Sequence, residues 1–173
     1  MLPRSIFLFV LILLAETIGL GQQVPADTRS RFEIHDGGRK RGFELALDEV
    51  TEKSAAKGEK GAKTSRKGKN LGEMRQMARE TEAASGGKVD IVLYEEGKPR
   101  DEFTRRVLTR RVLLKVAAGF DAQAAAAAVG ALKVERPPYA PGHVLFTLPG
   151  AGDALTKLDA LKALPGVLSA EPQ

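Results

Sequence analysis

Apolar residues in the last third of the chain, residues 110–173, recur in short segments that turn and cap residues separate. Val112, Leu114 and Val116 alternate with polar residues, which predicts a strand. An alanine-rich run follows Asp121 and stops at Gly130, and this combination is typical of a helix with both ends capped. The pattern therefore predicts a strand followed by a helix.

The rest of this region repeats the same kinds of segment in a different order. Two apolar stretches flank the turn signal Pro141–Gly142, which predicts two strands. Asp153 is expected to cap a second helix. The apolar face of this helix consists of Leu155, Leu158 and Leu161, which are spaced three residues apart. A last strand is predicted over residues 167–170. The resulting order β-α-β-β-α-β predicts an α+β fold with a ferredoxin-like unit at residues 110–173.

Several phrases in this region resemble the N-terminal prodomain of secreted bacterial subtilisin-like serine proteases. They are VLLKV before the alanine-rich helix, HVLFTLPG after it, and the closing phrase LPGVLSAEP. The upstream phrase VLYEEGKPRDEFTRRVLTRRVLLKV is similar to the lead-in of that prodomain in some large precursors. The resemblance covers residues 89–173. It implies a non-catalytic protein that assists the folding of a subtilisin-like catalytic domain, inhibits that domain, or does both.

The resemblance also implies one partner-binding residue. In these proteases, acidic side chains after the last prodomain strand meet the N-termini of two helices on the enzyme surface, and Glu171 matches that position. A carboxylate is stabilised there by the helix dipole and by unpaired N–H groups. An ordinary exposed glutamate remains the alternative interpretation.

One departure from the family keeps the biological setting open. The chain stops at Gln173, where a prodomain would continue into a cleft-binding tail and a catalytic domain. A truncated precursor, a gene fragment and an independent protein acting in trans are all compatible with this. A small envelope-associated binding or structural domain without a protease partner is the alternative function.

The N-terminal residues 1–21 have the features of a signal peptide. Arg4 precedes an uninterrupted apolar stretch over residues 6–15, which is short for a membrane span. Small residues place the expected cleavage between Gly21 and Gln22. We therefore expect a secreted or cell-envelope protein that meets the membrane only through this segment before cleavage, with a flexible leader over residues 22–30.

Residues 31–94 predict a smaller unit of the order β-β-α-β, with its first two strands joined at Gly37–Gly38. Its apolar residues are few, so we expect this unit to be stabilised by contact with the C-terminal unit or with a partner. Within it, residues 54–70 are rich in Lys, Gly and Ala and predict a mobile loop. Residues 95–109 are expected to be a connector.

The sequence predicts no catalytic residue, no metal site and no cofactor. His35 and His143 are the two histidines, cysteine is absent, and no Gly-x-Ser-x-Gly motif occurs. The net charge of +5 is concentrated partly in the Lys-rich segment, where no aromatic residue is available to stack on bases. Together with the expected export, this argues against a nucleic-acid partner.

Overall fold

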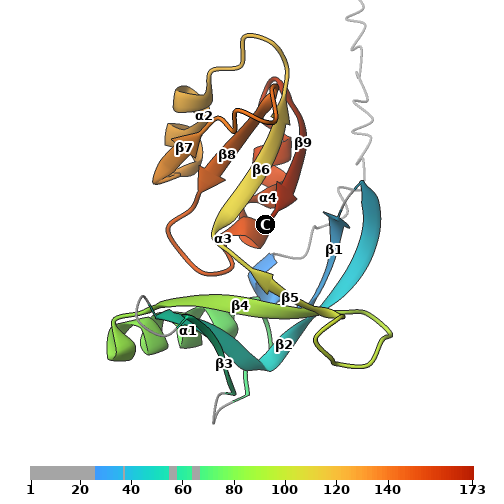
Figure 1. The fold of residues 1–173 in the computed structure, drawn as a ribbon, viewed down its shortest axis with the longest axis vertical. Helices are drawn as coiled ribbons and strands as arrows, with labels where there is room; N and C mark the ends of the chain where they lie inside the picture. The colour runs from blue at the N-terminus through green and yellow to red at the C-terminus, as the bar shows by residue number, and fades with distance from the viewer. Residues whose placement is uncertain (1–25, 37, 55–57, 64–66) are drawn as a thin grey trace, which may run out of the picture.

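The computed structural model describes residues 26–173 except 37, 55–57 and 64–66 (Figure 1). Two antiparallel sheets and the helices packed against them give an α+β architecture. The N-terminal half contains η1 (Ala26–Thr28), β1 (Arg31–Asp36), β2 (Arg39–Ser54), β3 (Gly58–Lys63), α1 (Leu71–Ser85), β4 (Lys88–Glu95) and β5 (Arg105–Leu108). The C-terminal half contains β6 (Arg111–Val116), α2 (Ala122–Val129), β7 (Lys133–Glu135), β8 (His143–Thr147), α3 (Asp153–Thr156), α4 (Leu158–Lys162) and β9 (Val167–Pro172).

The first sheet has five strands in the order β1–β2–β4–β5, with β3 paired to the far end of β2. β1 and β2 form the expected hairpin, and Phe32 lies directly opposite Phe43. Both faces of β4 are covered, because Val89 through Leu93 are all buried. Helix α1 packs on one face of this sheet.

Two strands of this sheet were not expected. β3 lies within the segment predicted to be a mobile loop, and its backbone pairs with β2 from Glu49↔Lys63 to Ser54↔Gly58. β5 lies within the predicted connector and pairs with β4 from Ile91↔Leu108 to Tyr94↔Arg105. The sequence pattern did not indicate these two strands, because an adjacent strand supplies backbone hydrogen bonds to a segment that lacks an apolar pattern of its own.

Helix α1 agrees with the sequence pattern. The side chain of Asn70 accepts a hydrogen bond from the backbone N–H of Glu73, and the helix ends at Gly86. Its buried face consists of Leu71, Met74, Met77 and Ala78, as the spacing of these residues predicted.

The second sheet has the order β7–β8–β6–β9, and all its pairings are antiparallel. Burial along β6 alternates, with Val112, Leu114 and Val116 pointing into the core. These residues belong to the same hydrophobic cluster as α2 and α4, which pack on this inner face. Figure 1 shows α4 behind the sheet.

The second predicted helix is broken into α3 and α4 at Lys157, and Asp153 is not its N-cap. Gly152 holds the N-cap position, while the Asp153 carboxylate accepts a hydrogen bond from the backbone N–H of Gly150. Asp153 is drawn into the interior because it also pairs with an arginine of α1. The predicted apolar face is confirmed, since Leu155, Leu158 and Leu161 are all buried.

The two halves share one hydrophobic core, and two ion pairs reinforce their contact. Arg75 of α1 donates a hydrogen bond of 2.5 Å to Asp153 of α3. Arg110, between β5 and β6, pairs with Glu82 of α1 and donates to the carbonyl oxygen of Pro149. Burial lowers the pKa of the Arg110 guanidinium, a shift that the Asp153 charge partly offsets. The smaller N-terminal unit thus packs directly on the C-terminal one.

Candidate functional site

Glu171 lies on β9, directly opposite Leu113 of β6, and its side chain is half-buried. Both residues belong to the outer face of the C-terminal sheet, which points away from α2 and α4. The strand alternation places Arg111 and Lys115 on the same face, and both are exposed. The sequence-predicted partner residue therefore lies on a sheet face that the helices leave open.

The centre of this outer face is apolar and its margin is charged. Leu113 lies opposite Leu145 of β8 between the flanking charges; Leu113 is half-buried, and Leu145 is only 7% exposed. At the β7 margin, Glu135 pairs with Lys133 at 3.0 Å and with Arg111 at 3.5 Å. The hydrogen bond from Lys133 is the main reason why the pKa of Glu135 lies below its usual value. Such a face, with an apolar centre and a polar rim, is typical of a protein-binding surface.

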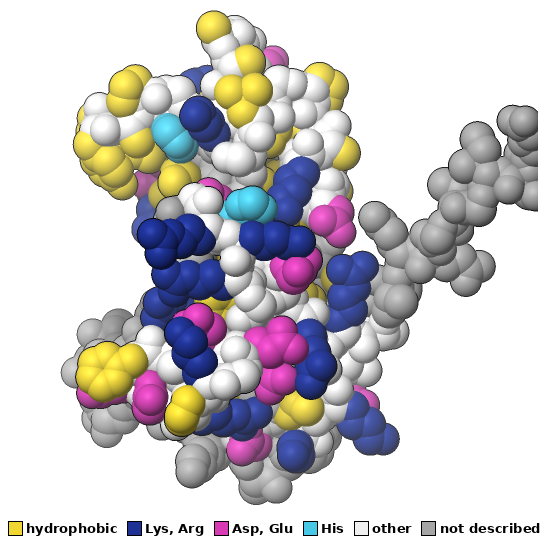
Figure 2. Space-filling view, turned by 90° about the vertical axis from the view of Figure 1, so that its right-hand side faces the viewer, with side chains coloured by type: hydrophobic (Ala, Val, Ile, Leu, Met, Phe, Trp, Pro, Cys, Tyr) yellow, Lys and Arg dark blue, Asp and Glu magenta, His cyan; other side chains and the backbone are white. Residues whose placement is uncertain are grey.

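A cleft of about 300 Å³ opens where this outer face meets the N-terminal sheet. Glu171 and Gln173 line one side of it, and His35 and Arg106 line the other. Its apolar lining consists of Ile34, Phe43, Leu93, Val107, Leu108, Leu113 and Pro172. Glu171 therefore stands beside a cavity to which both halves of the chain contribute. In Figure 2, Lys and Arg side chains gather across the middle of the face that is drawn.

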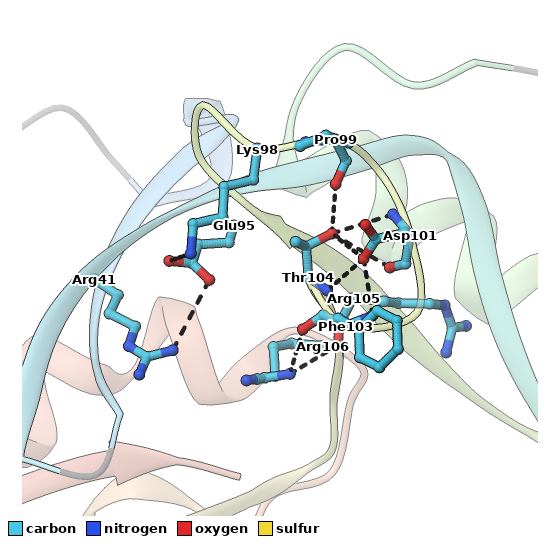
Figure 3. Close-up of polar contacts among 9 residues, drawn as sticks. All are labelled: Arg41, Glu95, Lys98, Pro99, Asp101, Phe103, Thr104, Arg105 and Arg106. Atoms are coloured by element: carbon cyan, nitrogen blue, oxygen red, sulfur yellow. Dashed lines mark hydrogen bonds and ion pairs between the residues drawn. The ribbon is translucent and has the colours of Figure 1, made fainter.

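An exposed aromatic residue on the turn before β5 is a feature that sequence reasoning missed. The ring of Phe103 is 79% exposed. The turn itself is closely bonded: the Asp101 carboxylate accepts from the backbone N–H groups of Phe103 and Thr104, and the buried Thr104 hydroxyl donates to the Pro99 carbonyl (Figure 3). The Asp-x-x-Thr spacing after Gly97 and Pro99 was the available signal for such a turn.

The turn is joined to the sheet by a second polar group. Arg105 donates to the Glu49 carboxylate at 2.9 Å and to the Thr51 hydroxyl at 2.6 Å. Tyr94 donates its phenolic proton to the same carboxylate at 2.7 Å. At the start of the turn, the hydrogen bond from Lys98 is the main cause of the lowered pKa of Glu95, and Arg41 lies on the other side of that carboxylate (Figure 3).

Tyr94 should titrate above its ordinary pKa of 10.0, because burial and then the hydrogen bond to Glu49 both favour the neutral phenol. Glu49→Gln should lower that pKa, since it removes the negative charge beside the phenolate. The folded-state pKa is raised, so the associated stability is present below pH 10 and is lost as the pH rises through the Tyr94 pKa. Ultraviolet titration of the unchanged protein and of Glu49→Gln measures the shift. Tyr94→Phe identifies the phenolate absorbance that belongs to Tyr94. An unchanged titration in Glu49→Gln would contradict the assigned cause.

The two histidines lie on different sheets. His35 is exposed on β1, and His143 is half-buried at the start of β8, opposite Lys115. Within residues 26–173, apart from the short gaps stated above, no three His, Asp or Glu side chains form a group that could hold a metal ion.

The expected cleavage site, Gly21–Gln22, lies outside the described residues. In the part of the chain that the structure describes, no helix is long and apolar enough to cross a membrane.

Comparison of the chain with protein-family models, with curated proteins and with solved structures found no match in any of the three.

Proposed function

We propose that this chain is an exported, non-catalytic, prodomain-like protein that docks on the catalytic domain of a subtilisin-like serine protease. In this role it assists the folding of that domain, inhibits it, or does both. The sequence resemblance over residues 89–173 suggests this function. The observation that carries the proposal is the C-terminal sheet, whose helices pack on one face and leave Leu113, Leu145 and Glu171 on the other.

The strand order supports the ferredoxin-like assignment of the C-terminal unit. The chain runs β6–α2–β7–β8–α3–α4–β9, with β6 and β8 as the two central strands and β9 and β7 at the edges. This is the βαββαβ succession, interrupted only by the break between α3 and α4. Because that fold serves many functions, the docking face, rather than the fold, must carry the functional argument.

Docking on this face has a simple physical basis. Burial of the exposed part of Leu113 against the enzyme would supply apolar contact, because Leu145 is already only 7% exposed. The Glu171 carboxylate would be favoured at the N-termini of the enzyme's surface helices. The charged margin around Arg111 and Lys115 would set the orientation of the partner.

The experiment is refolding of a denatured subtilisin-like catalytic domain with and without the exported chain, together with inhibition of the native enzyme. A protease encoded near this gene is the first choice of partner. We expect a higher refolding yield, slower proteolysis, or both. Glu171→Ala should weaken binding by roughly 0.3–1 kcal/mol because the helix-terminus contact is near the surface.

Asp159→Ala is the matched control, since Asp159 is an exposed carboxylate on α4, which packs on the opposite face of the same sheet. Equal losses of binding affinity in both variants would show that Glu171 does not make the helix-terminus contact. Docking on this face would not be contradicted. The absence of binding, inhibition and refolding assistance with every such protease would overturn the proposal. That result would favour an envelope-associated binding or structural domain.

A further inference from the structure

On the outer edge of β5, the backbone groups on either side of Val107 are already hydrogen-bonded. β5 is the last strand of its sheet and pairs only with β4 among the described strands. The backbone N–H of Glu95 donates to the Thr104 carbonyl, which identifies this opposed pair as a hydrogen-bonded one. By alternation, the backbone groups of Arg106 and Leu108 face β4, and those of Arg105 and Val107 face outward.

The neighbouring outward groups already have partners. The N–H of Arg105 donates to the Asp101 carbonyl, and the carbonyl of Arg105 accepts from the Arg106 guanidinium. On the other side, the N–H of Thr109 donates to the Gln173 carbonyl at 2.7 Å. In the described part of the chain, the outward N–H and carbonyl of Val107 bond to no other backbone group in the turns and loops.

The bond between Thr109 and Gln173 brings the end of β9 to the edge of β5. β5 and β6 belong to different sheets, and the chain bends between them (Figure 1). Two outward backbone groups at one residue are what an added strand needs to form a close pair of hydrogen bonds.

The 300 Å³ cleft lies beside the same residue, because Val107 and Leu108 form part of its lining together with Gln173. The lining includes the half-buried Leu113 and the buried side chains of Phe43 and Leu93. An extended peptide has alternate side chains on opposite faces, so a residue next to Val107 could direct its side chain into this space. The backbone edge and the cavity together match strand-addition recognition of a peptide.

We propose that the outward edge of β5 at Val107 and the adjoining cleft bind an extended segment of another polypeptide. The segment runs antiparallel to β5, makes its hydrogen bonds with Val107, and inserts one apolar side chain between Leu108 and Leu113. The site shares Leu113 with the face proposed to dock on the protease, but its ligand is different, because it is defined by an extended backbone and one apolar side chain.

The test is an NMR titration of the full chain with an acetylated and amidated threonine pentapeptide that carries a central leucine. We expect saturable shifts at the Val107 amide and at the cleft residues, and weaker binding of the same peptide with serine at its centre. Val107→Pro removes the outward N–H and leaves the bonds to β4 in place. It should weaken binding by about threefold or more, within the range of one lost hydrogen bond.

Leu113→Ser tests the cleft independently of any effect of proline on folding. Leu132→Ser is its control, because Leu132 is 71% exposed and does not line the cleft. Loss of affinity in Leu113→Ser but not in Leu132→Ser supports the site. Equal binding of the leucine and serine peptides, shifts confined to other regions, or full affinity in Leu113→Ser would each overturn it. None of these outcomes involves the protease, so they leave the proposed function unaffected.

Discussion

Gly152→Ala should lower the free energy of unfolding by about 2–5 kcal/mol, combining left-handed backbone strain with overpacking of a filled interior. Gly152 has a φ of +75° and stands where the C-terminal unit meets α1 and β4. A Cβ atom there would lie 2.8 Å from Ile91 Cδ1, 2.9 Å from Arg75 Cγ and 3.0 Å from Leu71 Cδ1. Urea unfolding of both chains measures the difference.

Gly97→Ala separates the two causes. Gly97 has nearly the same φ, +73°, but no atom lies within 4 Å of the position that its Cβ would occupy. It should therefore show only the backbone strain, roughly 1–2 kcal/mol. If Gly152→Ala costs no more than Gly97→Ala, the two halves are not packed together as closely as the structure places them.

Asp153→Ala should cost about 3 kcal/mol, the lower end of the range for removing one partner of a buried ion pair. The Asp153 side chain is 6% exposed, and its carboxylate accepts hydrogen bonds from Arg75 and from the N–H of Gly150. Its loss leaves Arg75, whose side chain is 20% exposed, without its more buried partner. Because water still reaches Arg75, the loss should not approach the upper end of the range.

Asp27→Ala is the matched control, because Asp27 binds the same guanidinium at 2.8 Å but is 51% exposed. An exposed pair of this kind contributes roughly 0–1 kcal/mol. Thermal or urea unfolding under identical salt conditions compares the two variants. Similar losses would show that burial does not distinguish the two carboxylates. Replacing both members of the inner pair, with Arg75→Met and Asp153→Ala together, should recover part of the stability.

Where the sequence predicted the structure well, the signal was local. The face of α1 follows from the three- and four-residue spacing of Leu71, Met74, Met77 and Ala78, and the core face of β6 follows from simple alternation. Asp121 caps α2 as expected, because a cap depends only on its own side chain and the next two or three N–H groups. Such elements carry their determinants within a few residues.

The sequence-based predictions failed where a distant partner supplied the interaction. Gly58–Lys63 and Arg105–Leu108 have no apolar pattern that marks them as strands, and they become strands because β2 and β4 offer free backbone groups. Asp153 was assigned a cap role from its place before a helix, but Arg75, far away in the sequence, takes its carboxylate. A pattern of residue types within one segment contains no information about such a partner.

The same division holds for the candidate site. Glu171 was singled out as a candidate from the closing phrase of the chain, but it was expected just after the last strand, whereas the structure places it within β9. The cleft beside it could not be identified, because its lining comes from β1, β2, β4, β5, β6 and β9. Local periodicity determined which residues face the core of each element. The packing of the two sheets determined which surfaces meet, because contact between distant segments depends on the relative placement of whole elements and not on the spacing within any one of them.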